Sequence, residues 1–123
     1  MIDFDDADLD RYLAEDPGGP VVMLNLLRFR PDGGAESYLD YGRHFAAAGL
    51  DDRYGLQVVY AGSGTTALVA EDGQQWDMVV LVRYPGRRAF VDMVRDPAYQ
   101  EFEHLRRDAL VEAVLQPTVP PAV

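Results

Sequence analysis

The sequence has no cysteine and no lysine, and it has only two histidines. The lack of cysteine excludes disulfides, thiolate metal ligands and thiol nucleophiles. The lack of lysine excludes Schiff-base catalysis and the phosphate transfer of P-loop proteins. The two histidines do not have the HxxxH spacing of a zinc-binding helix, so we expect neither a metal nor another cofactor.

Basic residues are also scarce. The 11 arginines stand against 21 acidic residues, which gives a formal net charge of -10 and a pI of about 4.4. Such a chain lacks the basic face that binds nucleic acid or an anionic membrane. No stretch approaches the roughly 20 apolar residues of a membrane helix. The first ten residues are acidic where a signal peptide is basic, so we expect a cytoplasmic protein.

Two segments are apolar on both of their alternating faces. Residues 76–83 read WDMVVLVR, and residues 21–27 read VVMLNLL. A strand that is exposed on one side alternates apolar with polar residues, so these segments predict a sheet that is covered on both faces. A chain of 123 residues forms one domain, and its own helices can cover only one of these faces. We expect a second copy of the chain to cover the other, as in a symmetric homodimer.

The remaining pattern alternates helices with strands. Apolar spacing and turn residues predict helices at 5–15 and 35–48, and a helical region that begins near residue 87. Asp96-Pro97 breaks that region, with Asp96 capping its second piece. Strands are predicted at residues 21–29, 57–69, 75–84 and 111–115, with Gly62 and Gly64 interrupting the second and a tight turn near residue 72.

This order, βαββαβ after a helical prefix, predicts an α+β fold of the ferredoxin-like type. Two helices would lie on one face of an antiparallel sheet, with the first and third strands side by side at its centre. Those are the two strands that are apolar on both faces. We divide the chain into a helical extension (1–20), the ferredoxin-like domain (21–116) and a proline-rich tail (117–123).

Two motifs resemble a known family. MLNLLRF at residues 23–29, the pattern WDxVxLVRYPxRxAFxxMxxDPxYQ at residues 76–100, and the arginine of the following helix are similar to the DUF1330 family. That family belongs to the dimeric α+β barrel superfamily. The resemblance covers residues 21–115 and implies a homodimer whose sheets pack together. It implies little about activity, because relatives in the superfamily include cofactor-independent oxygenases, haem-degrading oxygenases, lactone isomerases and stress-response proteins.

Asn25 is the strongest single candidate for chemistry, because it interrupts an apolar central strand. In one interpretation its amide faces a pocket between sheet and helices and stabilises a ligand oxyanion. In the other it bonds to backbone at a bulge or at the dimer interface. His104, with Asp108 four residues later, is the candidate general base. His44, with Asp40 four residues earlier, has the same arrangement, and an exposed helix ion pair is the alternative for both.

Arginines and tyrosines are the candidate ligand-binding residues. Arg28 and Arg83 lie near the ends of the central strands, where each would bind a ligand carboxylate or phosphate, or form a salt bridge. Asp77 is a candidate partner for such a salt bridge. The tyrosines would either line an aromatic pocket or simply fill the core: Tyr38, Tyr41, Tyr84 and Tyr99. Asn25, Trp76 and His104 match the residue types of haem-degrading relatives, but Trp76 and His104 are too far apart in sequence, so we expect no haem.

Two functions follow from these residues. The first is a cofactor-independent, oxygenase- or isomerase-like enzyme that acts on a small aromatic or carbonyl metabolite in the pocket. The second is a non-catalytic ligand-binding or stress-related dimer. A titratable group within hydrogen-bond reach of Asn25 would favour the enzyme.

Overall fold

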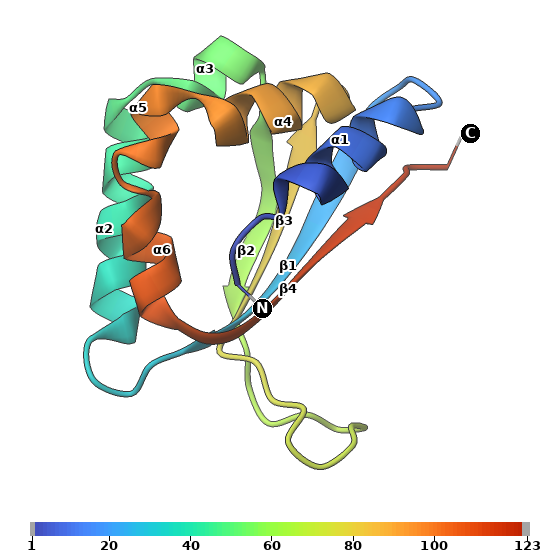
Figure 1. The fold of residues 1–123 in the computed structure, drawn as a ribbon. Helices are drawn as coiled ribbons and strands as arrows, with labels where there is room; N and C mark the ends of the chain where they lie inside the picture. Colours follow the sequence, from blue (N-terminus) through green and yellow to red (C-terminus); the bar gives the residue numbers. More distant parts are fainter. Residues whose placement is uncertain (1, 122–123) are drawn as a thin grey trace.

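The computed structural model describes residues 2–121, so Met1 and the last two residues of the proline-rich tail lie outside the described residues. The sheet has the strand order β2-β3-β1-β4 (Figure 1). Its strands are β1 (Val21–Phe29), β2 (Gln57–Ser63), β3 (Met78–Tyr84) and β4 (Leu110–Thr118). The helices are α1 (Asp6–Ala14), α2 (Gly34–Ala47), α3 (Leu50–Tyr54), α4 (Arg87–Arg95), α5 (Pro97–Gln100) and α6 (Glu103–Ala109).

The predicted ferredoxin-like topology is confirmed. β1 and β3 are adjacent, antiparallel and central, with Asn25 opposite Val80. β4 pairs with the other side of β1, and β2 pairs with the other side of β3. β4 begins one residue earlier than predicted and ends three residues later, because it follows β1 along almost its full length. No helix in the described part of the chain is long and apolar enough to span a membrane.

The β2–β3 connection corrects the predicted strand ends. β2 ends at Ser63 rather than at residue 69, and β3 begins at Met78 rather than at residue 75. The amide of Gly64 donates to the Asp77 carbonyl at 2.9 Å, and the backbone of Trp76 leaves no room there for a Cβ. The chain then leaves the sheet as a long loop, with Leu68 and Val69 almost fully exposed (Figure 1).

The helices cover one face of the sheet and form the core with it (Figure 1). Residues on alternate positions of β1 and β3 point into this core, among them Met23 and Leu27 of β1 and Val80 of β3. From the helix side, Phe90, Val91 and Tyr99 complete it. The burial of these side chains is the main force that holds helices and sheet together.

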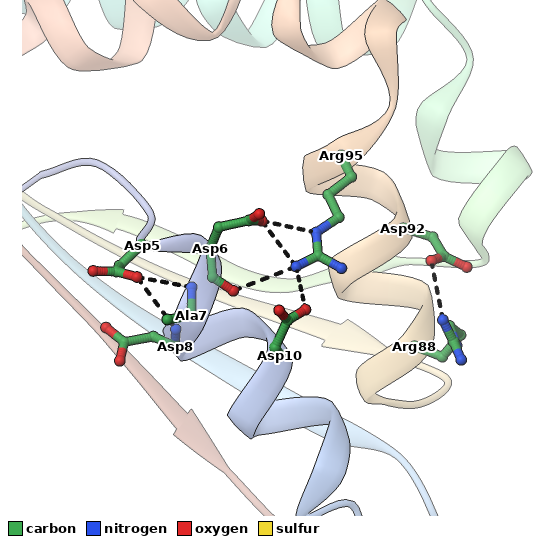
Figure 2. Close-up of polar contacts among 8 residues, drawn as sticks. All are labelled: Asp5, Asp6, Ala7, Asp8, Asp10, Arg88, Asp92 and Arg95. Carbon is green, nitrogen blue, oxygen red and sulfur yellow. Dashed lines mark hydrogen bonds and ion pairs between the residues drawn. The ribbon is translucent and has the colours of Figure 1, made fainter.

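The N-terminal helix joins this same core. Leu9 of α1 is 7% exposed and packs with the residues of the main cluster. Figure 2 shows how α1 is fixed to α4: the guanidinium of Arg95 lies 2.8 Å from the Asp6 carboxylate and 2.7 Å from that of Asp10. The Asp5 carboxylate caps α1 by accepting from the amide of Ala7 at 2.8 Å. A domain boundary near residue 20 stays a prediction.

The break in the second helical region is where the sequence predicts it. Asp96 ends α4 and caps α5, with Pro97 as the first residue of α5. The side chain of Asp96 accepts hydrogen bonds from the hydroxyl of Tyr54, the amide of Ala98 and, at 2.8 Å, the guanidinium of Arg53. These bonds hold the pKa of Asp96 at about 2, below the usual 3.8. They also anchor the short helix α3, which the sequence analysis does not predict.

The opposite face of the sheet is covered by no helix of the described chain (Figure 1). The register places Leu24 of β1 beside Leu81 of β3, and Leu26 beside Val79, all four on this face and only half-buried. Tyr60 of β2 and Val114 of β4 extend the apolar surface and are exposed. We call this surface the outer face; exposed apolar surfaces of this kind mark interaction sites.

Candidate functional site

A cavity of about 290 Å³ lies between the helix-covered face of the sheet and the helices. Its lining is mostly apolar and aromatic, with few polar groups, which is the usual character of a small-molecule site. The polar groups come from separate elements: Asn25 from β1, Tyr38 and Tyr41 from α2, Asp51 from α3, Tyr84 from β3, Tyr99 from α5 and Arg106 from α6.

Asn25 lies at the cavity and also bonds to neighbouring backbone. It lines the cavity, and its Nδ2 donates to the backbone carbonyls of Val80 at 3.3 Å and Met23 at 3.5 Å. These two carbonyl oxygens fix the orientation of the side-chain amide, because the flipped amide would place Oδ1 against them. Within residues 2–121, Oδ1 receives no hydrogen bond. The atom that Asn25 offers to a ligand is therefore an acceptor, whereas the N–H groups expected for an oxyanion are directed to the backbone.

All four candidate tyrosines lie at the cavity, so the structure brings them together with Asn25. The hydroxyls of Tyr41 and Tyr99 are 2.9 Å apart and form a hydrogen bond. Burial raises the pKa of each tyrosine above its usual value of 10.0. The hydroxyls therefore stay protonated at neutral pH, and they act as hydrogen-bond donors and acceptors rather than as bases.

Arg106 is the polar residue of the cavity that the sequence analysis overlooks as a ligand-binding residue. It is 6% exposed, and among residues 2–121 no other charged side chain is buried. Its spacing contains a signal: it follows the buried Phe102 by four residues and precedes the buried Ala109 by three, so it lies on the apolar side of α6. The neighbouring Arg107 is exposed and pairs with Asp3 at 3.8 Å.

The other two candidate arginines lie away from the cavity. Arg28 forms a salt bridge with Glu112 at 3.1 Å, donates to the Gly73 carbonyl and packs over the ring of Trp76. The salt-bridge alternative is thus the one observed for Arg28, with Glu112 rather than Asp77 as the partner. Arg83 belongs to the outer face, opposite Val22, and does not line the cavity.

The structure does not bring the histidines to Asn25. His104 is exposed on α6 and lines no part of the cavity. The Nδ1 of His44 lies 2.8 Å from the Asp40 backbone oxygen, and its ring packs against Phe102. Asp51, at the start of α3, supplies the one carboxylate among the described residues that line the cavity. Within residues 2–121, no group of histidines and carboxylates is arranged to hold a metal ion.

Similarity to known proteins is found among solved structures. The RPA0582 protein of Rhodopseudomonas palustris, a protein of unknown function, is 34% identical and superimposes with a TM-score of 0.90. The alignment covers 100% of this chain and 98% of that one. The chain belongs to the same family as RPA0582. No protein-family model and no curated protein matches the sequence.

Two more distant structures share the fold with the RPA0582 family. A dimeric ferredoxin-like protein of unknown function from a Jannaschia species has a TM-score of 0.63 at 10% identity, covering 83% of this chain and 100% of its own. The hydroxynitrile lyase of Passiflora edulis has a TM-score of 0.65 at 11% identity, covering 87% and 98%. At these identities the similarity establishes the ferredoxin-like α+β fold alone.

Proposed function

We propose that this protein is a homodimer that binds a small aromatic or carbonyl-bearing metabolite in the cavity between sheet and helices. The observation that carries the proposal is the cavity itself. It holds about 290 Å³, and its apolar walls carry a few convergent polar groups from separate elements. We also propose that the chain belongs to the DUF1330 family, on its motifs at residues 23–29 and 76–100.

Homodimer formation is supported by the apolar outer face of the sheet. The Jannaschia protein, which shares the fold, is dimeric. A second copy that packs its own outer face against the first would bury Leu24, Leu26, Val79 and Leu81 without blocking the cavity, which lies on the other side of the sheet.

The polar groups of the cavity indicate which functional groups the ligand carries. Oδ1 of Asn25 accepts a hydrogen bond, so it suits a hydroxyl, an enol or an N–H group. The tyrosine hydroxyls, held neutral by burial, donate to carbonyl oxygens. Aromatic walls from Tyr41 and Phe45 favour a flat, apolar molecule.

A cofactor-independent enzyme, isomerase- or oxygenase-like, is the second candidate. Asp51 favours it, because a carboxylate at the cavity can take up and return a proton. The hydroxynitrile lyase of Passiflora edulis is an enzyme of the same fold. If the protein is an enzyme, Asp51→Asn abolishes turnover and leaves ligand binding almost unchanged. Equal turnover in this variant would contradict the role of Asp51.

A thermal-shift screen tests the binding function. The panel contains aromatic carboxylates, hydroxyquinones, lactones and haem. A ligand that binds only the native state raises Tm by mass action, and we expect a hydroxylated aromatic compound to do so. Asn25→Ala should keep the fold, at a cost of about 1 kcal/mol for its lost hydrogen bonds, and should lose most of the shift. No shift with any compound in folded wild-type protein would contradict the proposal.

A further inference from the structure

The cavity contains a buried positive charge with which no carboxylate of the described residues forms an ion pair. Arg106 is 6% exposed, and the ion pairs formed by residues 2–121 do not include it. An unpaired buried charge is costly, so proteins usually provide a partner. The overall charge of -10 makes the missing partner more notable, since acidic side chains are abundant.

The acidic side chains around Arg106 form no ion pair with it. Burial raises the pKa of Glu103, on the same helix, and the charges of Arg107 and Arg106 oppose this rise. A smaller cavity, which Arg106 also lines, has Asp3, Asp5 and Asp8 in its lining. Asp3 pairs with Arg107 at 3.8 Å, and Asp8 pairs with Arg11 at 2.9 Å. The Asp5 carboxylate caps α1 and points to the amide of Ala7, as Figure 2 shows. None of the three is within ion-pair distance of Arg106.

The guanidinium is fixed by one edge and free at the other. Its Nη1 donates to the Ile2 carbonyl at 3.0 Å, and the ring of Phe4 packs against it at 5.6 Å. The edge formed by Nε and Nη2 makes no hydrogen bond within residues 2–121. Both nitrogens keep some exposed surface, since they are not among the fully enclosed atoms without a partner, and Arg106 lines both cavities. This is the edge that binds a carboxylate through two parallel hydrogen bonds.

The larger cavity suits an anion with an apolar body. Arg106 lowers the pKa of Tyr38, Tyr41, Tyr84 and Tyr99 against the raising effect of burial, so its charge is felt by all four rings. The smaller cavity is lined by three carboxylates, which would repel an anion, whereas Asp51 is the carboxylate among the described residues that line the larger one.

We propose that Arg106 is the anion-binding residue of the larger cavity and that the natural ligand carries a carboxylate on a flat, apolar body. The inference rests on the proposed function and adds the charge of the ligand to it. The carboxylate lies against the free edge of the guanidinium, and the apolar body extends between the tyrosines toward Asn25.

Two probes of equal shape test this, 2-naphthoate and its neutral amide, 2-naphthamide, titrated by calorimetry into the full-length protein. Wild type should bind the carboxylate roughly tenfold or more tightly than the amide, the effect of a charge-assisted hydrogen bond pair. Arg106→Met should remove this preference and leave amide binding intact. Arg106→Lys should restore part of it, because it restores the charge.

Arg107→Met is the matched control, since it removes an exposed arginine one residue away and should leave the preference unchanged. Circular dichroism of each variant verifies folding. If wild type binds both probes equally, or if folded Arg106→Met keeps the preference, the anion inference is wrong while cavity binding stands. If folded wild type binds neither probe, both proposals fail for flat aromatic ligands.

Discussion

At the scale of single residues, the hydroxyls of Tyr41 and Tyr99 show how the cavity wall is held in place. They come from α2 and α5, and their hydrogen bond of 2.9 Å joins these two helices. Tyr99 is 1% exposed, so its hydroxyl depends on this partner. The pair both stabilises the fold and fixes the polar atoms that a ligand meets.

A double-mutant cycle measures this pair. Tyr41→Phe leaves a buried hydroxyl without its partner and should destabilise the protein by about 1–3 kcal/mol in urea unfolding. The double variant with Tyr99→Phe should cost less than the sum of the two single changes, by about 1 kcal/mol. Tyr38→Phe combined with Tyr99→Phe serves as the control and should be additive, because no hydrogen bond joins those hydroxyls within the described residues. Additivity in the first cycle would refute the coupling.

The residues of the site differ in how well the sequence reveals them. Asn25 stands out because a polar residue in an otherwise apolar strand is costly unless it has partners. Arg106 stands out less, since only its spacing from Phe102 and Ala109 distinguishes it from the neighbouring arginine in a charged helix. Its burial depends on Ile2 and Phe4, more than 100 residues earlier, which pack over it. A contact over that sequence distance leaves no local pattern.

At the scale of elements, the junction of α2 with the end of α6 depends on close backbone approach. A Cβ on Gly34 would lie 2.6 Å from the Ala109 carbonyl oxygen, which is backbone and cannot move aside. Gly42 lies in the same helix, and a Cβ on it would meet nothing within 4 Å. An alanine therefore clashes at Gly34 but has free space at Gly42 of the same helix.

Gly34→Ala should destabilise the protein by about 1–3 kcal/mol, the usual cost of overpacking. Gly42→Ala should stabilise it by up to about 1 kcal/mol, because alanine favours the helix. Urea unfolding of both variants gives the comparison. Stabilisation by both substitutions would show that α2 is not held this closely against the α6–β4 junction.

Elements with strong local signals are predicted well, and those that depend on tertiary contacts are not. β1 agrees with its predicted bounds, and Asp96-Pro97 breaks the helix as expected, because both signals are local. The sequence does not predict α3, since five residues have little helix stability of their own. Asp96 holds this helix through Tyr54 and Arg53, a contact across some 40 residues that local pattern does not encode.

At the scale of the whole molecule, the two faces of the sheet have separate roles. The helix-covered face holds the cavity, and the outer face presents Leu24, Leu26, Val79 and Leu81 to solvent. The segments that are apolar on both faces predict from sequence that each face of the sheet is covered. The chain supplies one cover itself, and we expect a second copy to supply the other.

Leu81→Glu, at the centre of the outer face, should convert the dimer to a monomer. Light scattering after size exclusion should give wild type twice the chain mass of 13.7 kDa and this variant a single chain mass. Leu39→Glu, on the exposed side of α2, is the control and should remain dimeric. A monomeric wild type, or a dimeric Leu81→Glu, would exclude the outer face as the interface.

If the cavity is the ligand site, a side chain that fills it should abolish ligand binding. Val82→Phe places a ring in the cavity from the central strand, whereas Val59→Phe adds the same ring at an exposed position of β2 outside the lining. The measurement is the rise in Tm caused by the best compound of the screen. We predict that the rise persists in Val59→Phe and disappears in folded Val82→Phe. An undiminished rise in Val82→Phe would place the ligand elsewhere and contradict the account.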